Sequence, residues 1–266
     1  MAKPSRYSIW PREVWKAATQ AERVAMVDEY ALGSLDDPER FLVLLEHPHD
    51  FVRARSVCAL ARQDTPAIRA FMRAAMTDSV DSVREAAADA IGLYRDRRDI
   101  IRLTIALAGD PSWFVRSSAA DALGTIGHRS ASAALKAALR YDSAPIVRRN
   151  AAAALVAVRA KHTHRALVEA LARERNAFSR IGISIGLYTF GDRAARRRLH
   201  HAMRSGNMLI LSNIFNVDLA DYVRQEDYDG FRRRASRIME THDLEVVREE
   251  AAAFIARLDA RLGPAA

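Results

Sequence analysis

The chain has 266 residues, of which 50% are hydrophobic and 28% charged, and its formal net charge is +8. This composition excludes a disordered or fibrous protein, and 11 Gly with 8 Pro are few for a protein rich in strands and turns. The single cysteine, Cys58, excludes an internal disulfide and any zinc or iron–sulfur site built from cysteines.

We expect no signal peptide at the N-terminus. It lacks the apolar core of a signal peptide, and the chain nowhere contains 18 apolar residues without a charge. We therefore expect a cytoplasmic protein without a membrane partner. Trp10 and Pro11 then open an amphipathic stretch that predicts a helix over 11–31, because proline suits the first turn of a helix.

A motif of about 32 residues is repeated along the rest of the chain. Each copy has an arginine or its replacement at an anchor position, often a small residue three positions later, and Leu or Ile seven positions later. Steps of 31 to 36 residues connect the seven anchors, the sixth of which has lost its arginine. These anchors are Arg53, Arg84, Arg116, Arg148, Arg180, Ser212 and Arg248.

The spacing of apolar and small residues around each anchor is that of one face of an α-helix. A second amphipathic stretch precedes each of these helices, at 37–46, 66–76, 97–108, 130–140, 162–173, 192–205 and 224–240. The sequence therefore predicts an all-α fold, a right-handed α-solenoid of about seven helix pairs. Residues 36–266 would form this single continuous solenoid, and residues 1–35 an N-terminal capping helix.

The segment 110–127, Asp-Pro-Ser-Trp-Phe-Val-Arg-Ser-Ser-Ala-Ala-Asp-Ala-Leu-Gly-Thr-Ile-Gly, resembles the HEAT repeat. It is more closely similar to the short HEAT-like repeats of phycobilin lyases, and the resemblance covers residues 36–260. In that family, an acidic residue before each second helix and the arginine at its start form a ladder between adjacent repeats. The resemblance therefore implies structural roles for Asp78, Asp110, Asp142, Arg84, Arg116 and Arg148.

No catalytic pattern can be recognised in the sequence. HEAT-like hydroxylases bind iron through His-Glu pairs, and none of the eight histidines here precedes a glutamate. Adjacent histidines such as His200 and His201 point apart on a helix, whereas ligand pairs favour spacings of three or four. Phosphate-binding glycine loops and nucleophile elbows are absent, and Cys58 has no identifiable base. We expect no catalytic residue, cofactor or metal ligand, and an interaction protein more than an enzyme.

The second helices of the fifth and sixth repeats are apolar on almost every side. At positions that face the concave side of such a solenoid, earlier repeats have polar groups and these repeats have aliphatic ones. If exposed, this face would bind a partner protein or peptide, and neighbouring arginines would select acidic residues in it. If tight curvature or the C-terminal pair covers it, it is core. The residues concerned are Ile181, Ile185, Asn213, Ile214, Val217, Arg148 and Arg149.

Basic residues gather in 130–210, which contains 15 Arg and Lys against 4 Asp and Glu. Five arginines of the predicted helix 192–205 are candidates for contact with phosphate or with an acidic protein, and a solvated surface is the alternative. They are Arg193, Arg196, Arg197, Arg198 and Arg204. Arg232, Arg233, Arg234 and Arg237 repeat this pattern near the C-terminus.

Three classes of function fit these observations. The first is a non-enzymatic scaffold or adaptor that binds a partner protein in its concave groove. The second is a nucleic-acid-binding protein, either a phosphate-backbone binder or one similar to the HEAT-like DNA glycosylases. The glycosylase motif is absent from the sequence, and Trp113, Asp121 and Arg149 are the residues that would mimic the aromatic, acidic and basic groups of its site. The third is a lyase or chaperone for a cofactor-bearing protein. The scaffold is our first hypothesis because it requires no residue that the sequence lacks.

Overall fold

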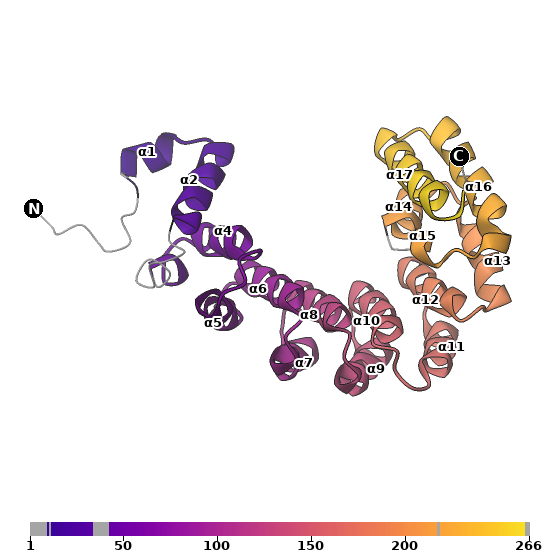
Figure 1. Cartoon of the computed structure of the whole chain (residues 1–266), viewed down its shortest axis with the longest axis horizontal. Helices are drawn as coiled ribbons and strands as arrows, with labels where there is room; N and C mark the ends of the chain where they lie inside the picture. The colour runs from indigo at the N-terminus through magenta and orange to yellow at the C-terminus, as the bar shows by residue number, and fades with distance from the viewer. Residues whose placement is uncertain (1–9, 11, 34–42, 217–218, 264–266) are drawn as a thin grey trace, which may run out of the picture. The chain divides into compact units, whose positions relative to one another are not determined.

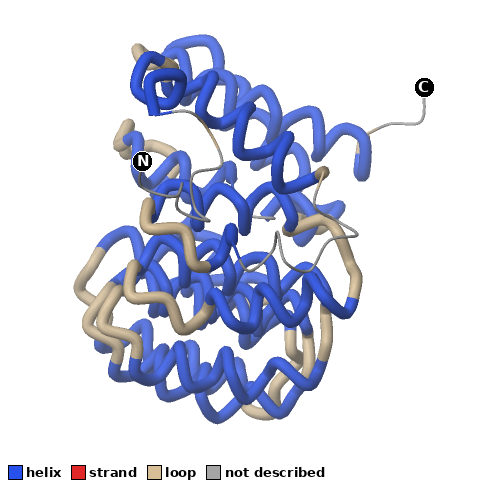
Figure 2. Tube along the Cα trace, turned by 90° about the vertical axis from the view of Figure 1, so that its left-hand side faces the viewer, coloured by secondary structure: helices blue, strands red, loops and turns tan. Residues whose placement is uncertain are grey.

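The computed structural model describes residues 10, 12–33, 43–216 and 219–263, which form helices joined by short connections. Figure 2 shows helices and loops, without a strand in this described part of the chain. Within the same residues, no helix is both long enough and apolar enough to cross a membrane. The predicted all-α fold is confirmed. The chain divides into two compact units, Met1–Ala131 and Ser132–Ala266.

The first unit contains an N-terminal helix pair followed by alternating helices of the repeats. In Figure 1, α4, α6 and α8 lie in one row. Helices α5 and α7 lie below this row, where α5 packs against α6 and α7 against α8. The elements are α1 (Arg12–Ala17), α2 (Gln20–Leu32), α4 (Asp50–Leu60), α5 (Pro66–Ala75), α6 (Asp81–Tyr94), η1 (Arg97–Asp99), α7 (Ile100–Gly109), α8 (Trp113–Ile126) and η2 (Arg129–Ala131).

The N-terminal cap consists of two helices rather than the single helix predicted over 11–31. The chain breaks at Thr19, whose hydroxyl accepts a hydrogen bond from the Glu22 N–H while the Glu22 carboxylate accepts one from the Thr19 N–H. This reciprocal capping box starts a new helix. The second helix, α2, packs against α4, and Arg55 Nε donates to Asp28 Oδ1 at 2.6 Å. Of the two helices, α2 is the one that packs against α4 of the first repeat.

The second unit continues the same alternation. Helices α10, α12, α14 and α17 pack against one another in this order, and α9, α11, α13 and α16 flank them. The elements are α9 (Ser132–Tyr141), α10 (Pro145–Ala157), α11 (Thr163–Arg173), α12 (Ala177–Thr189), α13 (Arg193–Ala202), α14 (Met208–Asn216), α15 (Leu219–Tyr222), η3 (Gln225–Asp227), α16 (Tyr228–Thr241) and α17 (Glu245–Leu262).

Most helices predicted from the repeat lie within a few residues of the observed ones. The predicted first helix of the first repeat, 37–46, falls largely outside the described residues. The largest correction concerns the sixth repeat, because α14 begins 31 residues after α12 and not 32. Leu211 therefore stands at the anchor position that the sequence spacing assigned to Ser212. The Ser212 hydroxyl instead donates to the Glu250 carboxylate at 2.6 Å.

An arginine–carboxylate ladder connects successive repeats. Arg84 donates through Nε and Nη2 to the two oxygens of Asp110, at 2.8 and 2.9 Å, and through Nη1 to its own repeat's Asp78 carbonyl at 2.8 Å. Arg53 binds Asp78 in the same way, and Arg148 binds Glu174. The implied structural role of the ladder is confirmed for these three pairs. Such bidentate, charge-assisted bonds fix both the distance and the direction between helices.

Each ladder acid also holds the connection that leads into the next helix. The carboxylates of Asp78, Asp110 and Glu174 accept the backbone N–H two residues further on, at 2.9 Å in all three cases. Burial alone would raise the pKa of Glu174, but hydrogen bonds from Arg148, Asn176 and Ser179 outweigh it and hold this pKa at about 2. The ladder acid is therefore ionised whenever the protein is near neutral pH.

We predict that Arg84→Gln lowers the free energy of unfolding by about 1.5–3 kcal/mol, the usual value of a hydrogen bond to a charged group. The Asp110 side chain, only 10% exposed, would lose its guanidinium partner. Urea denaturation followed by circular dichroism measures this change. Arg62→Gln is the control, because Arg62 is exposed on the same unit. Equal stabilities of the two variants would contradict the ladder's role.

The ladder also predicts a pH dependence. The pKa of Glu174 is about 2 in the folded chain against an ordinary value of 4.5, so its ionised form stabilises the fold above about pH 4.5. This contribution disappears as the pH falls toward 2. The stability difference between wild type and Glu174→Gln should therefore be largest near neutral pH and shrink on acidification, as measured by urea midpoints at each pH. Glu240→Gln, at an exposed position, should show a constant difference.

Candidate anion-binding site

The positive charge of the protein resides in the second unit. Residues 1–131 contain 18 cationic and 18 anionic side chains, whereas residues 132–266 contain 23 and 15. The whole net charge of +8 therefore belongs to the second unit, which is the unit that attracts anions.

The aliphatic residues predicted to form a partner-binding groove do not form one. Ile181, Ile185 and Ile214 are 8%, 4% and 0% exposed, and Val217 lies outside the described residues. Helix α12 is surrounded by α10, α11, α13 and α14, which explains why it is apolar on all sides. The condition of exposure is not met for Ile185 and Ile214, for which the alternative of a covered core face holds, whereas Ile181 lines a cavity.

Arg149 and Asn213, from the same predicted groove, hold this core together. Arg149 Nε donates to the Asn213 side-chain oxygen at 3.1 Å, and the Asn213 amide donates to the Phe178 carbonyl at 2.8 Å. These bonds link α10, α12 and α14. Gly182 makes the approach feasible, because a Cβ at this position would lie 2.3 Å from Cγ of Arg149. Arg149 is thus engaged inside the unit, as Arg148 is in the ladder with Glu174.

The five arginines predicted on 192–205 do not form one continuous stripe. Arg196 Nη1 donates to Asp227 Oδ1 at 2.6 Å and is occupied by this internal ion pair. Arg193 and Arg197 are exposed beside it, around a cavity of about 480 Å³. Arg198 is partly buried on another face of α13, and exposed Arg204 lies beyond the end of that helix. The structure separates these arginines into different cavities.

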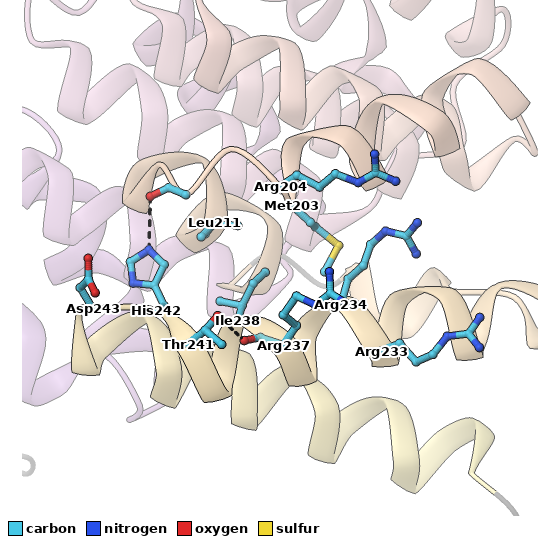
Figure 3. Close-up of a pocket in the computed structure, with 11 residues that line it drawn as sticks. Met203, Arg204, Leu211, Arg233, Arg234, Arg237, Ile238, Thr241, His242 and Asp243 are labelled. Carbon is cyan, nitrogen blue, oxygen red and sulfur yellow. Dashed lines mark hydrogen bonds between the residues drawn. The ribbon is translucent and has the colours of Figure 1, made fainter.

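Four arginines without an acidic partner surround one cavity of the second unit, here named the arginine pocket. Its volume is about 780 Å³, and it lies between the end of α13, the start of α14 and helix α16. Arg204, Arg233 and Arg234 lie toward one end in Figure 3, while His242 and Asp243 lie at the other. The cations of the pocket are Arg204, Arg233, Arg234 and Arg237, and apolar side chains of Met203, Leu211 and Ile238 complete its wall.

The electrostatics of the arginine pocket favour an anion. Burial lowers the pKa of Arg234, and the positive charges of its three neighbouring arginines lower it further. Arg234 Nη1 donates to the Gly230 carbonyl at 2.7 Å, but its buried Nε has no partner among the described residues. In contrast to the ladder, no carboxylate of the described chain forms an ion pair with any of the four. An anion that entered would relieve their mutual repulsion.

His200 of α13 is partly buried against α16. Its ring lies against Phe231, with the ring centroids 4.3 Å apart. Burial and the nearby charge of Arg234 lower the pKa of His200 to about 4, so its ring is neutral near pH 7. Its Nδ1 is buried without a hydrogen-bond partner in the described structure. His200 therefore contributes packing between the two helices rather than positive charge.

Other residues singled out in the sequence do not assemble into a reactive site. Trp113 and Phe114 stack on each other at 3.6 Å and are both more than 40% exposed. Desolvation of its thiol, with a further contribution from Asp89, raises the pKa of Cys58, whereas a nucleophilic cysteine requires a lowered one. Among the described residues, no group of three His, Cys, Asp or Glu side chains could hold a metal ion.

Comparison with known proteins bears on the fold. The structure of the complex of CpcE and CpcF of phycocyanin lyase, from Nostoc sp. PCC7120, is similar to this chain with a TM-score of 0.59 and 16% sequence identity. The similarity covers 84% of this chain and 94% of that one. A search of curated proteins finds no match.

The repeat pattern itself matches a known family over much of the chain. HEAT repeats match residues 38–124, 81–156 and 102–185, which together cover more than half of the sequence. These matches coincide with the alternating helices and with the arginine–carboxylate ladder described above. The chain therefore belongs to the family of HEAT-repeat proteins.

Proposed function

We propose that this protein is a non-enzymatic interaction scaffold that binds an acidic segment of a partner protein in the arginine pocket. One observation carries the proposal: four arginines surround a single cavity, and none forms an ion pair with a carboxylate of the described chain. Elsewhere, arginines form ion pairs with carboxylates, as in the ladder and between Arg196 and Asp227. Unpaired cations that repel one another reduce stability, and an anionic partner compensates for this reduction.

The form of the arginine pocket favours protein carboxylates over a nucleic-acid backbone. Its cations converge on one concavity, whereas a backbone requires cations in a row that follows regularly spaced phosphates. The arginines that would supply such a row are divided among three cavities, and Arg196 is paired with Asp227. They are Arg193, Arg196, Arg197, Arg198 and Arg204. Guanidinium groups bind carboxylates in a bidentate manner, and the apolar wall accommodates the aliphatic part of an acidic side chain.

A role as lyase or chaperone for a cofactor-bearing protein is the second candidate function. Its support is the similarity in fold to the complex of CpcE and CpcF of phycocyanin lyase. Both candidates require a protein partner, and they differ in whether binding depends on the partner's cofactor. Binding that requires a cofactor on the partner would favour this second candidate. The cytoplasmic location expected from the sequence stays a prediction.

We predict that a fluorescent hexaglutamate peptide binds the protein and that Arg233→Gln weakens this binding at least about tenfold, the equivalent of one charge-assisted hydrogen bond. Arg233 is exposed, so its removal should leave the melting temperature unchanged or raise it by relieving repulsion. Fluorescence anisotropy and thermal denaturation measure the two effects. Arg165→Gln is the matched control, since it removes one charge from α11 at a side chain 82% exposed. Equal losses in both variants would contradict a specific pocket.

Duplex DNA tests the nucleic-acid alternative in the same assay. We expect weak binding through exposed arginines. A plot of the logarithm of the binding constant against the logarithm of the salt concentration should have a slope of about −3.6 if four phosphates are neutralised. Binding that stays tight at high salt, or that exceeds binding of hexaglutamate at equal ionic strength, would favour the nucleic-acid alternative over the scaffold.

A further inference from the structure

The ladder of paired arginines ends at Arg180, on α12. Arg180 Nη1 donates to the carbonyl of Glu174 at 2.7 Å, which is the same bond that Arg84 makes with the carbonyl of Asp78. In Arg84, however, Nε and Nη2 are bound to the acid of the next repeat. No carboxylate of the described chain binds Arg180. Nη1 of Arg180 also donates to the Leu171 carbonyl at 3.2 Å. Arg180 thus keeps the carbonyl bond of a ladder arginine but lacks the acid that completes the pair.

The residue that replaces this acid is Ser205. Every ladder acid stands three residues before the first residue of the next helix, and Ser205 stands three before Met208, the first residue of α14. The Ser205 hydroxyl also accepts the N–H two residues further on, from Asn207 at 3.3 Å, as Asp110 does from Ser112. Ser205 is thus the structural equivalent of a ladder acid. It is neutral and too short to form the bidentate pair.

Arg180 lines a second cavity, here named the ladder-end cavity, which has a volume of about 620 Å³. Ser205 and His201 line it as well, and the remaining arginines are Arg197 and Arg198. Its other lining residues are mostly apolar, and no acidic residue lines it. The buried Nη1 of Arg198 has no hydrogen-bond partner among the described residues. An anion with an adjacent apolar group therefore complements both its charge and its wall.

The ladder-end cavity lies next to the arginine pocket. The turn after α13 contributes Ser205 to the first and Arg204 and Gly206 to the second. At the start of α14, Leu209 is 61% exposed, and Ile210 lines the ladder-end cavity. One extended segment that crosses this turn can therefore contact both sites. Gly206 offers no obstacle, because a Cβ at this position would meet no atom within 4 Å.

We propose that a carboxylate of the acidic partner replaces the missing ladder acid at Arg180, and that an apolar side chain beside it packs in the ladder-end cavity. This inference rests on the proposed function, because it specifies the sequence of the same partner segment: acidic residues interrupted by an apolar one. The carboxylate binds Nε and Nη2 of Arg180, and the apolar side chain packs near Ile181 and Ile210.

Restoring the acid within the chain tests the first half of the inference without a ligand. Ser205→Asp should pair with Arg180 and raise the melting temperature by about 2–4 °C relative to Ser205→Asn, the shift expected for about 1 kcal/mol in a domain of this size. Asparagine keeps the size and the acceptor oxygen but has no charge. The difference should vanish in an Arg180→Gln background. No difference between Asp and Asn in the wild-type background would overturn the equivalence of Ser205 with the ladder acids.

Peptide binding tests the second half. Fluorescence anisotropy compares hexaglutamate with the same peptide containing one leucine after its third glutamate. We expect the leucine to tighten binding to wild type about tenfold, by burial of its side chain. Ser205→Asp, whose carboxylate would occupy Arg180, should lose this gain, and Ser205→Asn should retain it. Arg165→Gln again controls for the change of one charge.

The outcomes separate this inference from the proposed function. If hexaglutamate binds but the leucine adds nothing, or if Ser205→Asp keeps the gain in full, the ladder-end cavity is not part of the binding surface and the inference is wrong. If neither peptide binds wild type, the proposed function fails, and this inference fails with it.

Discussion

The pairing of an anchor arginine with the acid of the following repeat, made by Arg53, Arg84 and Arg148, is the constraint on which this structure depends. The guanidinium connects two repeats at once, since Nη1 holds a carbonyl of its own repeat while Nε and Nη2 hold the next carboxylate. The geometry permits little sliding between the helices, so the ladder fixes their register. The ladder ends at Arg180. From this residue onward, arginines that form no ion pair with a described carboxylate line two cavities.

Much of the fold could be predicted because the ladder arginines recur at regular intervals in the sequence. The arginine spacing located the helix pairs, and the resemblance to HEAT repeats identified the pairing of Arg84 with Asp110. The prediction failed where the period changed. A 31-residue step between α12 and α14 moves the anchor to Leu211, and no feature of spacing alone distinguishes this from Ser212 with a 32-residue step. The break in the cap at Thr19 could have been found from its capping box with Glu22.

The proposed binding surface was harder to predict, for a physical reason. An apolar face in a repeat sequence indicates burial or binding equally well, and only the packing of neighbours decides between them. Here Gly182 lets Arg149 approach α12 closely and bond to Asn213 of α14, and Ile185 of α12 is 4% exposed. The arginine pocket combines Arg204 after α13 with three arginines of α16, and their convergence depends on how the two helices pack. The basic pattern of both stretches was visible, but their meeting at one cavity was not.

The bond between Arg149 and Asn213 changes how the second unit unfolds. In an ideal solenoid each repeat contacts only its neighbours, and repeats can detach from an end one at a time. This bond joins residues 64 positions apart and skips over a whole helix pair, with Phe178 of that pair bound to the same Asn213. Loss of α14 would leave the Arg149 guanidinium without this acceptor, so the end of the solenoid cannot fray without disturbing its middle. The bond therefore couples the end of the second unit to its middle, in contrast to an ideal solenoid whose repeats contact only their neighbours.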